Sequence, residues 1–124
     1  MERFLLISIG AILGANARYW VGDWVAQRYG TTFPFGTMLI NLTGSLVLGF
    51  FLTLATERFL LDPRWRIVIA IGFLGGYTTF STYTYESVNL MLTGQWALGL
   101  LNLLGSAILG AVAVAGGIFL GRWL

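Results

Sequence analysis

The chain has 124 residues, of which 57% are hydrophobic and 10% are charged, and its formal net charge is +2. Because a soluble domain carries roughly 25% charged residues, this composition indicates an integral membrane protein. Cysteine and histidine are absent, which excludes disulfides, thiolate chemistry and most transition-metal sites. No basic patch interleaved with aromatic residues lies outside the apolar stretches, so nucleic acid is not an expected partner.

Four apolar stretches are long enough to cross a membrane, since a span needs about 20 helical residues. They are Phe4–Ala26, Phe35–Thr56, Pro63–Leu92 and Trp96–Leu120. The short connections between them predict antiparallel packing of neighbouring spans. We therefore expect an all-α membrane protein whose residues 1–124 form a single domain of four transmembrane helices. Ala15-Asn16-Ala17 could instead end a cleaved secretory signal, but the apolar pattern continues past it.

The first span contains Arg18, in the segment GANARYW. A charge inside a span is costly and usually marks a functional path or a buried pair. Alternatively, the Arg18 side chain extends to the membrane interface, where Asp23 is close in sequence. The sequence alone leaves both interpretations open.

The second span contains Asn41, in the segment GTMLINLTG. Its amide offers two donor hydrogens and an acceptor oxygen, and it shares a helical face with Ser45 and Gly49. This pattern suits either the wall of a polar path or an amide that holds two helices together.

The third span is too long for one upright helix. Residues 63–92 would extend about 45 Å, against a hydrocarbon core of about 30 Å. Gly75-Gly76 and the hydroxyl-rich run Tyr77–Tyr85 favour a break in mid-membrane. Such a break persists only where it is buried in protein or lines a polar cavity, and its free carbonyls can bind a small cation. The alternative is an unbroken helix whose hydroxyls bond back to its own carbonyls.

The fourth span is almost free of polar side chains except Asn102 and Ser106, which lie one helical turn apart. Together the spans are rich in hydrogen-bond donors and poor in acids, a combination that suits an anion path. Aromatic ring edges add to it, because they carry the positive part of the ring quadrupole. The sequence shows no nucleophile–base pair, phosphate loop or metal cluster, so we do not expect an enzyme.

These residues resemble those of a known family, the CrcB or Fluc fluoride channels. The resemblance runs nearly end to end and rests on Gly14-Ala15 with Arg18-Tyr19, on Gly36-Thr37 with Asn41 and Gly44, and on GFLGGYTTFST in the third span. It implies a passive, fluoride-selective channel of the inner (plasma) membrane that exports cytoplasmic fluoride and confers resistance to it. It also implies an antiparallel, dual-topology homodimer with two pores in which lipid surrounds the protein.

The resemblance implies roles for individual residues as well. The breaks of two third helices would meet at the dimer centre, where backbone carbonyls of Gly75 and Thr78 hold a structural sodium ion. The implied fluoride path comprises Arg18, Asn41, Thr79, Phe80, Tyr83 and Ser106. Along it, amide, hydroxyl and ring-edge donors would replace the hydration shell of the anion, and the charge of Arg18 would favour entry.

The chain departs from the family pattern at three places. Tyr83 stands where the family has a second phenylalanine, so it would contact the anion by ring edge or by hydroxyl. Gly110 and Val114 interrupt the hydroxyl track that follows Ser106. Arginines also concentrate at one end of the spans, at positions 3, 58, 64, 66 and 122, which favours one orientation with both termini in the cytoplasm. An oppositely oriented partner is therefore an alternative to the homodimer.

Two rival functions also fit a small membrane protein. A proton-coupled exporter of small cationic drugs would need a membrane-embedded acid, for which Glu86 is the only candidate. The first span offers Asn16 and Arg18 instead, which argues against this function. A non-transporting assembly factor would need only the small residues that recur four apart, such as Gly10 and Gly14.

Overall fold

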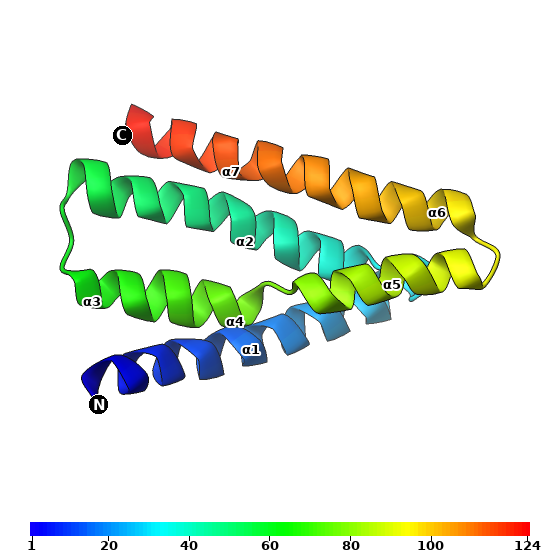
Figure 1. Ribbon diagram of the computed structural model, residues 1–124, viewed down its shortest axis with the longest axis horizontal. Coiled ribbons are helices and arrows are strands. Elements are labelled where there is room, and N and C mark those ends of the chain that lie inside the picture. The colour runs from blue at the N-terminus through cyan, green and yellow to red at the C-terminus, as the bar shows by residue number, and fades with distance from the viewer.

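The computed structural model describes residues 1–124, and every regular element in it is a helix (Figure 1). The elements join into four rods that alternate in direction. The first rod is α1 (Glu2–Tyr29), and the second is α2 (Phe35–Thr53) continued by the π-turn η1 (Leu54–Arg58). The third comprises α3 (Pro63–Arg66), the π-helical η2 (Ile67–Leu74), α4 (Gly75–Tyr77) and α5 (Phe80–Leu92). The fourth comprises α6 (Trp96–Leu100), the π-turn η3 (Leu101–Gly105) and α7 (Ser106–Trp123).

Local sequence signals set the ends of these helices. The Asp62 side chain accepts a hydrogen bond of 2.8 Å from the Arg64 backbone N–H, and Pro63 occupies the first turn of α3. Together they form the cap expected at a helix N-terminus. Gly30 and Gly94, which follow α1 and α5, have φ angles of 76° and 86°. Glycine adopts this left-handed conformation without strain, so the chain can reverse direction there.

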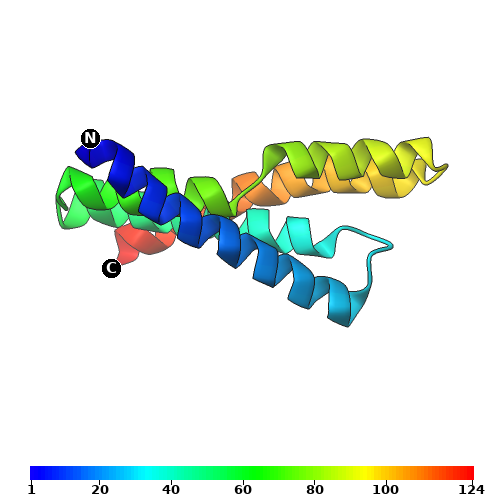
Figure 2. The ribbon, with the colours of Figure 1, turned by 90° about the horizontal axis from the view of Figure 1, so that it is seen from below.

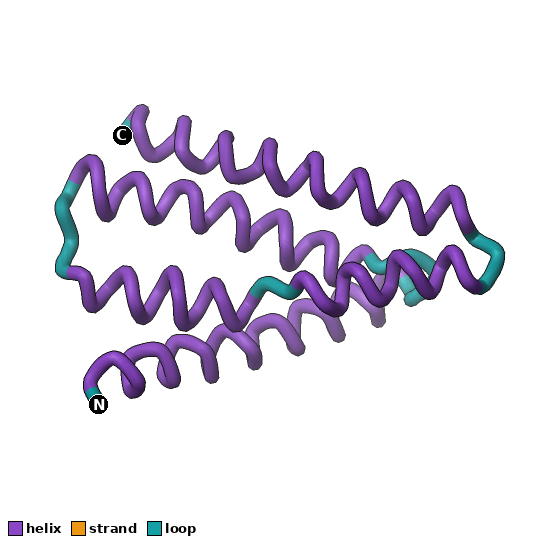
Figure 3. The backbone as a smooth tube through the Cα atoms, in the orientation of Figure 1, coloured by secondary structure: helices purple, strands orange, loops and turns teal.

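The third rod is interrupted, whereas the other three are continuous. Glu2–Tyr29, Phe35–Arg58 and Trp96–Trp123 are helices long and apolar enough to cross a membrane. In the third rod Thr78 and Thr79 are extended, with φ and ψ of −80° and 156° and of −146° and 122° (Figure 3). The break expected near Gly75-Gly76 therefore lies immediately after that pair and Tyr77.

Glycines allow two pairs of helices to pack closely in the half of the molecule that holds both termini. There α1 lies against η2 and α4, and a Cβ atom on Gly72 would be 2.9 Å from the Gly10 Cα. Likewise α2 lies against α7, where a Cβ on Gly117 would be 2.7 Å from the Phe50 backbone nitrogen. In lipid such contacts gain van der Waals energy because the backbones can approach. We call this half the closed half.

Beyond the break the third rod changes its partner. Whereas α4 packs against α1, α5 leaves α1 and packs against α6 and η3, as Figure 2 shows. This contact is also close, because a Cβ on Gly99 would be 2.7 Å from the Ser87 carbonyl oxygen. The change of partner opens a wedge between α5 on one side and α1 with the start of α2 on the other. We call this half the open half.

Ion pairs join the rods at the arginine-rich end of the closed half. The Arg64 Nε lies 2.7 Å from the Glu2 Oε1, and this ion pair links the third rod to the first. Arg122 makes two hydrogen bonds of 3.0 Å to Glu57, which links the fourth rod to the second. Arg58 adds a bond of 2.6 Å to the Arg122 carbonyl. Exposed pairs of this kind contribute little stability, but they neutralise part of the positive charge at this end.

Candidate functional site

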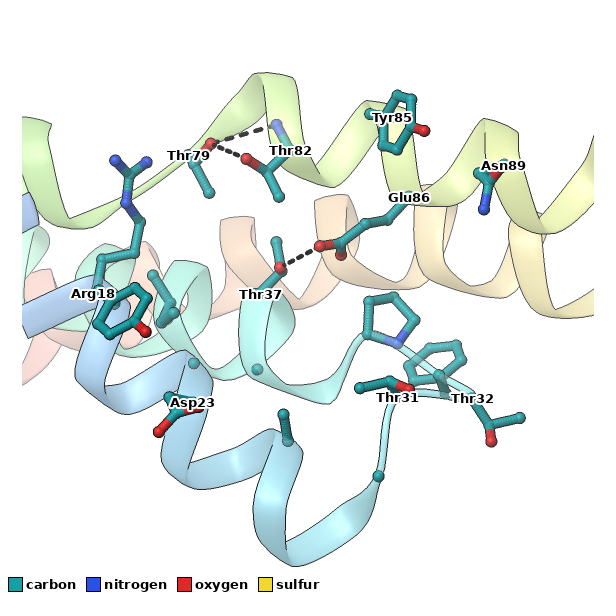
Figure 4. Close-up of a pocket in the computed structure, with 18 of the residues that line it drawn as sticks. Arg18, Asp23, Thr31, Thr32, Thr37, Thr79, Thr82, Tyr85, Glu86 and Asn89 are labelled. Atoms are coloured by element: carbon teal, nitrogen blue, oxygen red, sulfur yellow. Dashed lines mark hydrogen bonds between the residues drawn. The ribbon is translucent and has the colours of Figure 1, made fainter.

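The wedge in the open half contains a cavity of about 600 Å³ whose lining includes several polar side chains (Figure 4). Its walls are α1, the turn after it, the first residues of α2, and α5. We call this cavity the vestibule, and the polar side chains that line it include Arg18, Asp23, Thr37, Thr79, Thr82, Glu86 and Asn89. Such a cavity would admit water and hydrated ions to the level of the helix break.

Three charged side chains line the vestibule, Arg18 and Asp23 from α1 and Glu86 from α5 on the opposite wall. Arg18 projects from α1 and takes part in no ion pair, so its charge is available to the cavity. Glu86 lies on α5, where its Oε1 accepts a hydrogen bond of 2.9 Å from the Thr37 hydroxyl. The other carboxylate oxygen, Oε2, is buried and has no partner. Because Thr37 has only one proton, this bond withholds it from any ion that enters.

A second cavity of about 450 Å³ lies between α2, the break and α7. We call it the inner cavity. Its lining includes seven residues that the sequence singled out, namely Asn41, Gly75, Thr78, Thr79, Phe80, Tyr83 and Ser106. Thr79 also lines the vestibule. The structure thus brings these predicted residues together and leaves Arg18 apart from them, in the vestibule, with Thr79 between the two cavities.

The Asn41 side chain holds the break by bonding to both the carbonyl and the N–H of Thr79. The Asn41 Nδ2 donates to the Thr79 carbonyl at 2.9 Å, and the Thr79 N–H donates to the Asn41 Oδ1 at 2.8 Å. The asparagine thereby satisfies two backbone groups that the broken helix leaves without helical partners. Since an amide nitrogen has two hydrogens, one N–H of Asn41 remains for another acceptor.

The hydroxyl of Tyr83 has a partner inside the protein. Tyr83 is buried, and its hydroxyl donates to the backbone carbonyl of Leu103 in η3. The π-helical segment η3 interrupts the regular i to i−4 hydrogen bonds of the fourth rod, and its Leu103 carbonyl accepts this side-chain proton. The rings of Tyr83 and Phe80 lie 5.8 Å apart at an interplanar angle of 59°. What Tyr83 can offer to the inner cavity is therefore its ring, because its proton is already donated.

Ser106 belongs to a buried chain of hydrogen bonds between α7, η3 and α5. Its hydroxyl donates to the Asn102 Oδ1 at 3.1 Å, and the Asn102 Nδ2 donates to the Ser87 hydroxyl at 2.8 Å. Ser87 in turn donates to the Tyr83 carbonyl at 2.8 Å. The side chains of Asn102 and Ser87 are 1% and 0% exposed, so neither bond competes with solvent.

The backbone just before the break has carbonyl groups without helical partners. Thr78 still bonds to the Leu74 carbonyl, through its N–H at 3.0 Å and its hydroxyl at 2.8 Å. Because Thr78 and Thr79 are extended, no helical N–H follows to meet the carbonyls of Gly75 and Thr78. Gly75 is exposed on the surface of the chain. Backbone oxygens of this kind are suitable ligands for a hard cation.

Some polar residues of the site were not predicted from the sequence. Thr82 and Asn89 line the vestibule with Glu86, and together with Thr79 they recur every three or four residues on one face of α5. That spacing is visible in the sequence and could have identified the stripe. Thr37 belongs to the motif Gly36-Thr37, but its bond to Glu86 had no sequence signal, and neither did the role of Ser87, because both depend on partners far away along the chain.

A family model described as CrcB-like protein, Camphor Resistance (CrcB), matches residues 5–118. The chain belongs to the CrcB family. The apolar helices and this membership make it a multi-pass protein of the cell membrane.

Three relatives show how far the similarity extends, and each bears the name fluoride-specific ion channel FluC. The one from Koribacter versatilis (strain Ellin345) is 51% identical over 116 residues, 94% of this chain and 92% of its own length. The one from Chloroflexus aurantiacus (strain ATCC 29366 / DSM 635 / J-10-fl) is 46% identical over 123 residues, 99% and 98% of the two chains. The one from Sulfurihydrogenibium sp. (strain YO3AOP1) is 40% identical and covers 100% of both. None of these names is that of a drug exporter, so that alternative gains no support.

Proposed function

We propose that this CrcB-family protein is a passive, fluoride-selective ion channel. The observation that carries the proposal is the composition of the inner cavity. It offers an amide N–H of Asn41 and two aromatic rings, Ser106 lies in its wall, and no carboxylate lines it. The names of the full-length relatives support fluoride as the ion.

The two cavities suggest a path for the ion. Fluoride would enter the vestibule, where the unpaired charge of Arg18 attracts anions. It would then pass Thr79 and lose water in the inner cavity, where the Asn41 amide and the ring edges of Phe80 and Tyr83 replace part of its hydration. In this proposal, larger halides are excluded because these donors are spaced for a small anion. Transport is downhill, so cytoplasmic fluoride leaves the cell along its electrochemical gradient.

The proposed channel is an antiparallel homodimer, and the surface of the single chain supports a partner. Phe80 is 77% exposed, and Gly75 is exposed beside it. Lipid cannot hydrogen-bond to the free carbonyls of the break, so these groups require protein or an ion against them. The break lies near the middle of the third rod, so a two-fold axis in the membrane plane would place both breaks at one depth. Antiparallel packing also separates the two arginine-rich ends.

The proposed homodimer holds a sodium ion where the two breaks meet. The carbonyl oxygens of Gly75 and Thr78 from each copy are the proposed ligands, because they have no helical partners. No group of three or more acidic side chains lies together in the chain, so uncharged oxygens such as these carbonyls are the proposed ligands. A monovalent cation suits such uncharged oxygen ligands.

Fluoride efflux from liposomes tests the proposal. Purified protein is reconstituted into vesicles loaded with potassium fluoride, and a fluoride electrode records release after valinomycin is added. We expect rapid release of fluoride and no release of chloride from matched vesicles. Release that requires an imposed proton gradient would support an exporter, and release no faster than from protein-free vesicles would refute the channel.

Two further measurements address the dimer and the sodium ion separately. When two single-cysteine variants are mixed, one with an exposed cysteine at one end of the third rod and one with it at the other end, cross-linking should join unlike copies; cross-linking only between like copies would contradict the antiparallel arrangement. Replacement of all sodium by N-methylglucamine should abolish or slow fluoride release, whereas replacement of external potassium should not. Release that is indifferent to sodium would contradict the proposed cation site but leave the channel proposal intact.

A further inference from the structure

We propose that Asn102 is a positioning residue that competes with the transported anion for the proton of Ser106. This inference rests on the proposed channel function and concerns the inner cavity. Ser106 lines that cavity, whereas Asn102 does not. Asn102 lies behind it, 1% exposed, and accepts the Ser106 proton in the structure.

The direction of every bond in the chain follows from its last acceptor. The Tyr83 carbonyl can only accept, so the Ser87 hydroxyl must donate its proton there. Ser87 then has only lone pairs for Asn102, so the Asn102 amide must present its Nδ2 to Ser87. The Oδ1 atom therefore faces Ser106, and Ser106 has to donate. A backbone carbonyl of α5 thus determines the orientation of a hydroxyl on α7.

This orientation has a consequence for an anion in the inner cavity. Ser106 has one proton, and while Asn102 holds it the serine presents only lone pairs to the cavity. Lone pairs repel fluoride. For Ser106 to bind the anion, its hydroxyl must rotate away from the Asn102 Oδ1, which would then be left buried without a donor. Binding at Ser106 is therefore an exchange of one acceptor for another.

Such an exchange suits a conducting path. A site that binds an ion too strongly does not release it, and conduction requires binding weak enough for the ion to leave. The Asn102 Oδ1 lowers the affinity of Ser106 for fluoride by the strength of the bond that has to be broken. The same acceptor returns the hydroxyl to its starting position once the ion has passed.

The test is a double-mutant cycle between positions 102 and 106, measured in liposomes. Asn102→Leu removes the competing acceptor with a side chain of similar size. We expect it to lower the fluoride concentration at which flux is half-saturated by about three- to tenfold, the range expected for loss of one hydrogen bond. In the Ser106→Ala background the same change should have no effect on that concentration. Asn16→Leu is the matched control, because Asn16 is exposed on α1 and lines neither cavity.

A purely structural role for Asn102 would give a different result. The effect of Asn102→Leu would then persist unchanged in the Ser106→Ala background, and this would overturn the inference. Ser87→Ala provides a second variant if Asn102→Leu does not fold. Without Ser87 the Asn102 amide is free to turn over, so we expect a smaller shift in the same direction. An unchanged half-saturating concentration in Ser87→Ala would count against the proposal.

A structural measurement on the unmodified protein tests the same point. High-resolution structures with and without fluoride should show the Ser106 hydroxyl turned toward Asn102 in one and toward the inner cavity in the other. An unchanged Ser106–Asn102 bond in the presence of a bound anion would overturn the inference. If the unmodified protein releases no fluoride at all, it is the channel function that fails.

Discussion

The closed half and the open half of the molecule are made of the same four rods but are held together differently. In the closed half, glycines bring backbones into contact, and few polar side chains lie between the helices. In the open half, α5 separates from α1, and the space between them is lined by threonine, asparagine and charged side chains. Lipid supplies no hydrophobic force between helices, so van der Waals contacts have to hold the rods together. The closed half provides these contacts, and the open half can therefore keep a polar cavity.

The boundary between the halves is the break at Thr78 and Thr79. It changes the direction of the third rod, so the rod contacts α1 before the break and α6 after it. Asn41 fixes this boundary from α2, with bonds of 2.9 Å and 2.8 Å to Thr79. The inner cavity lies at this boundary, where the backbone is not satisfied by its own helix. The polar lining of the inner cavity is therefore linked to this one local feature.

Asn41→Asp should have the largest effect, because it acts at the boundary itself. An aspartate places a negative charge on the proposed anion path and has no N–H for the Thr79 carbonyl. We expect fluoride release from liposomes to fall to that of protein-free vesicles while the elution volume of the protein on gel filtration stays unchanged. Release at the rate of the unmodified protein would remove Asn41 from the path.

Gly117→Ala tests the closed half. The added methyl group would overlap the Leu46 carbonyl oxygen and lie 2.7 Å from the Phe50 nitrogen. We expect the variant to lose about 1–3 kcal/mol of stability, as overpacked sites do, measured as a lower unfolding temperature in detergent. Gly116→Ala is the control, since its nearest neighbour, the Leu46 side chain, would be 3.8 Å away. Equal unfolding temperatures for the two variants would contradict the close α2–α7 contact.

Arg18→Gln tests the vestibule of the open half. Removing the unpaired charge should slow fluoride release about threefold at low ionic strength, and the effect should shrink in high salt because exposed charges are screened. Arg28→Gln is the control, because Arg28 is on the same helix but does not line the vestibule. If both variants behave alike, the overall charge of that end is responsible and Arg18 has no special role.

Tyr83→Phe should have the smallest effect on transport. The Tyr83 hydroxyl already donates to the Leu103 carbonyl, so its removal leaves the ring in the cavity and costs the fold about 1 kcal/mol. Fluoride release and its selectivity over chloride should stay close to those of the unmodified protein. A large loss of selectivity would mean that the hydroxyl turns to the anion during transport.

Much of the fold could be predicted from the sequence, because its signals are local. Four long apolar stretches predicted four helical rods, and Gly75-Gly76 followed by hydroxyls predicted the break. The partner of each helix was not predictable in the same way. Nothing in residues 80–92 says that α5 leaves α1 for α6, because this follows from the direction of the chain after the break. The three π-helical segments were also not predicted.

The candidate site was predicted in its members but not in its hydrogen bonds. Asn41, Phe80, Tyr83 and Ser106 were named from the sequence, and the structure places them around one cavity. Their roles as fluoride ligands remain predictions. The sequence did not predict that the Asn41 amide bonds to both the N–H and the carbonyl of Thr79. It also did not predict that the Tyr83 hydroxyl donates to the Leu103 carbonyl. Each of these bonds joins two different rods.

The sequence by itself determined that this is a membrane protein of four helices with one break, because hydropathy, length and glycine content act locally and lipid cannot satisfy a free backbone. Only the tertiary structure decided which protons remain free for an ion. A hydroxyl has one proton, and its acceptor depends on the position of a neighbouring helix, as for Thr37 and Glu86, 49 residues apart, or Asn102 and Ser87, 15 apart. No local pattern encodes such a position.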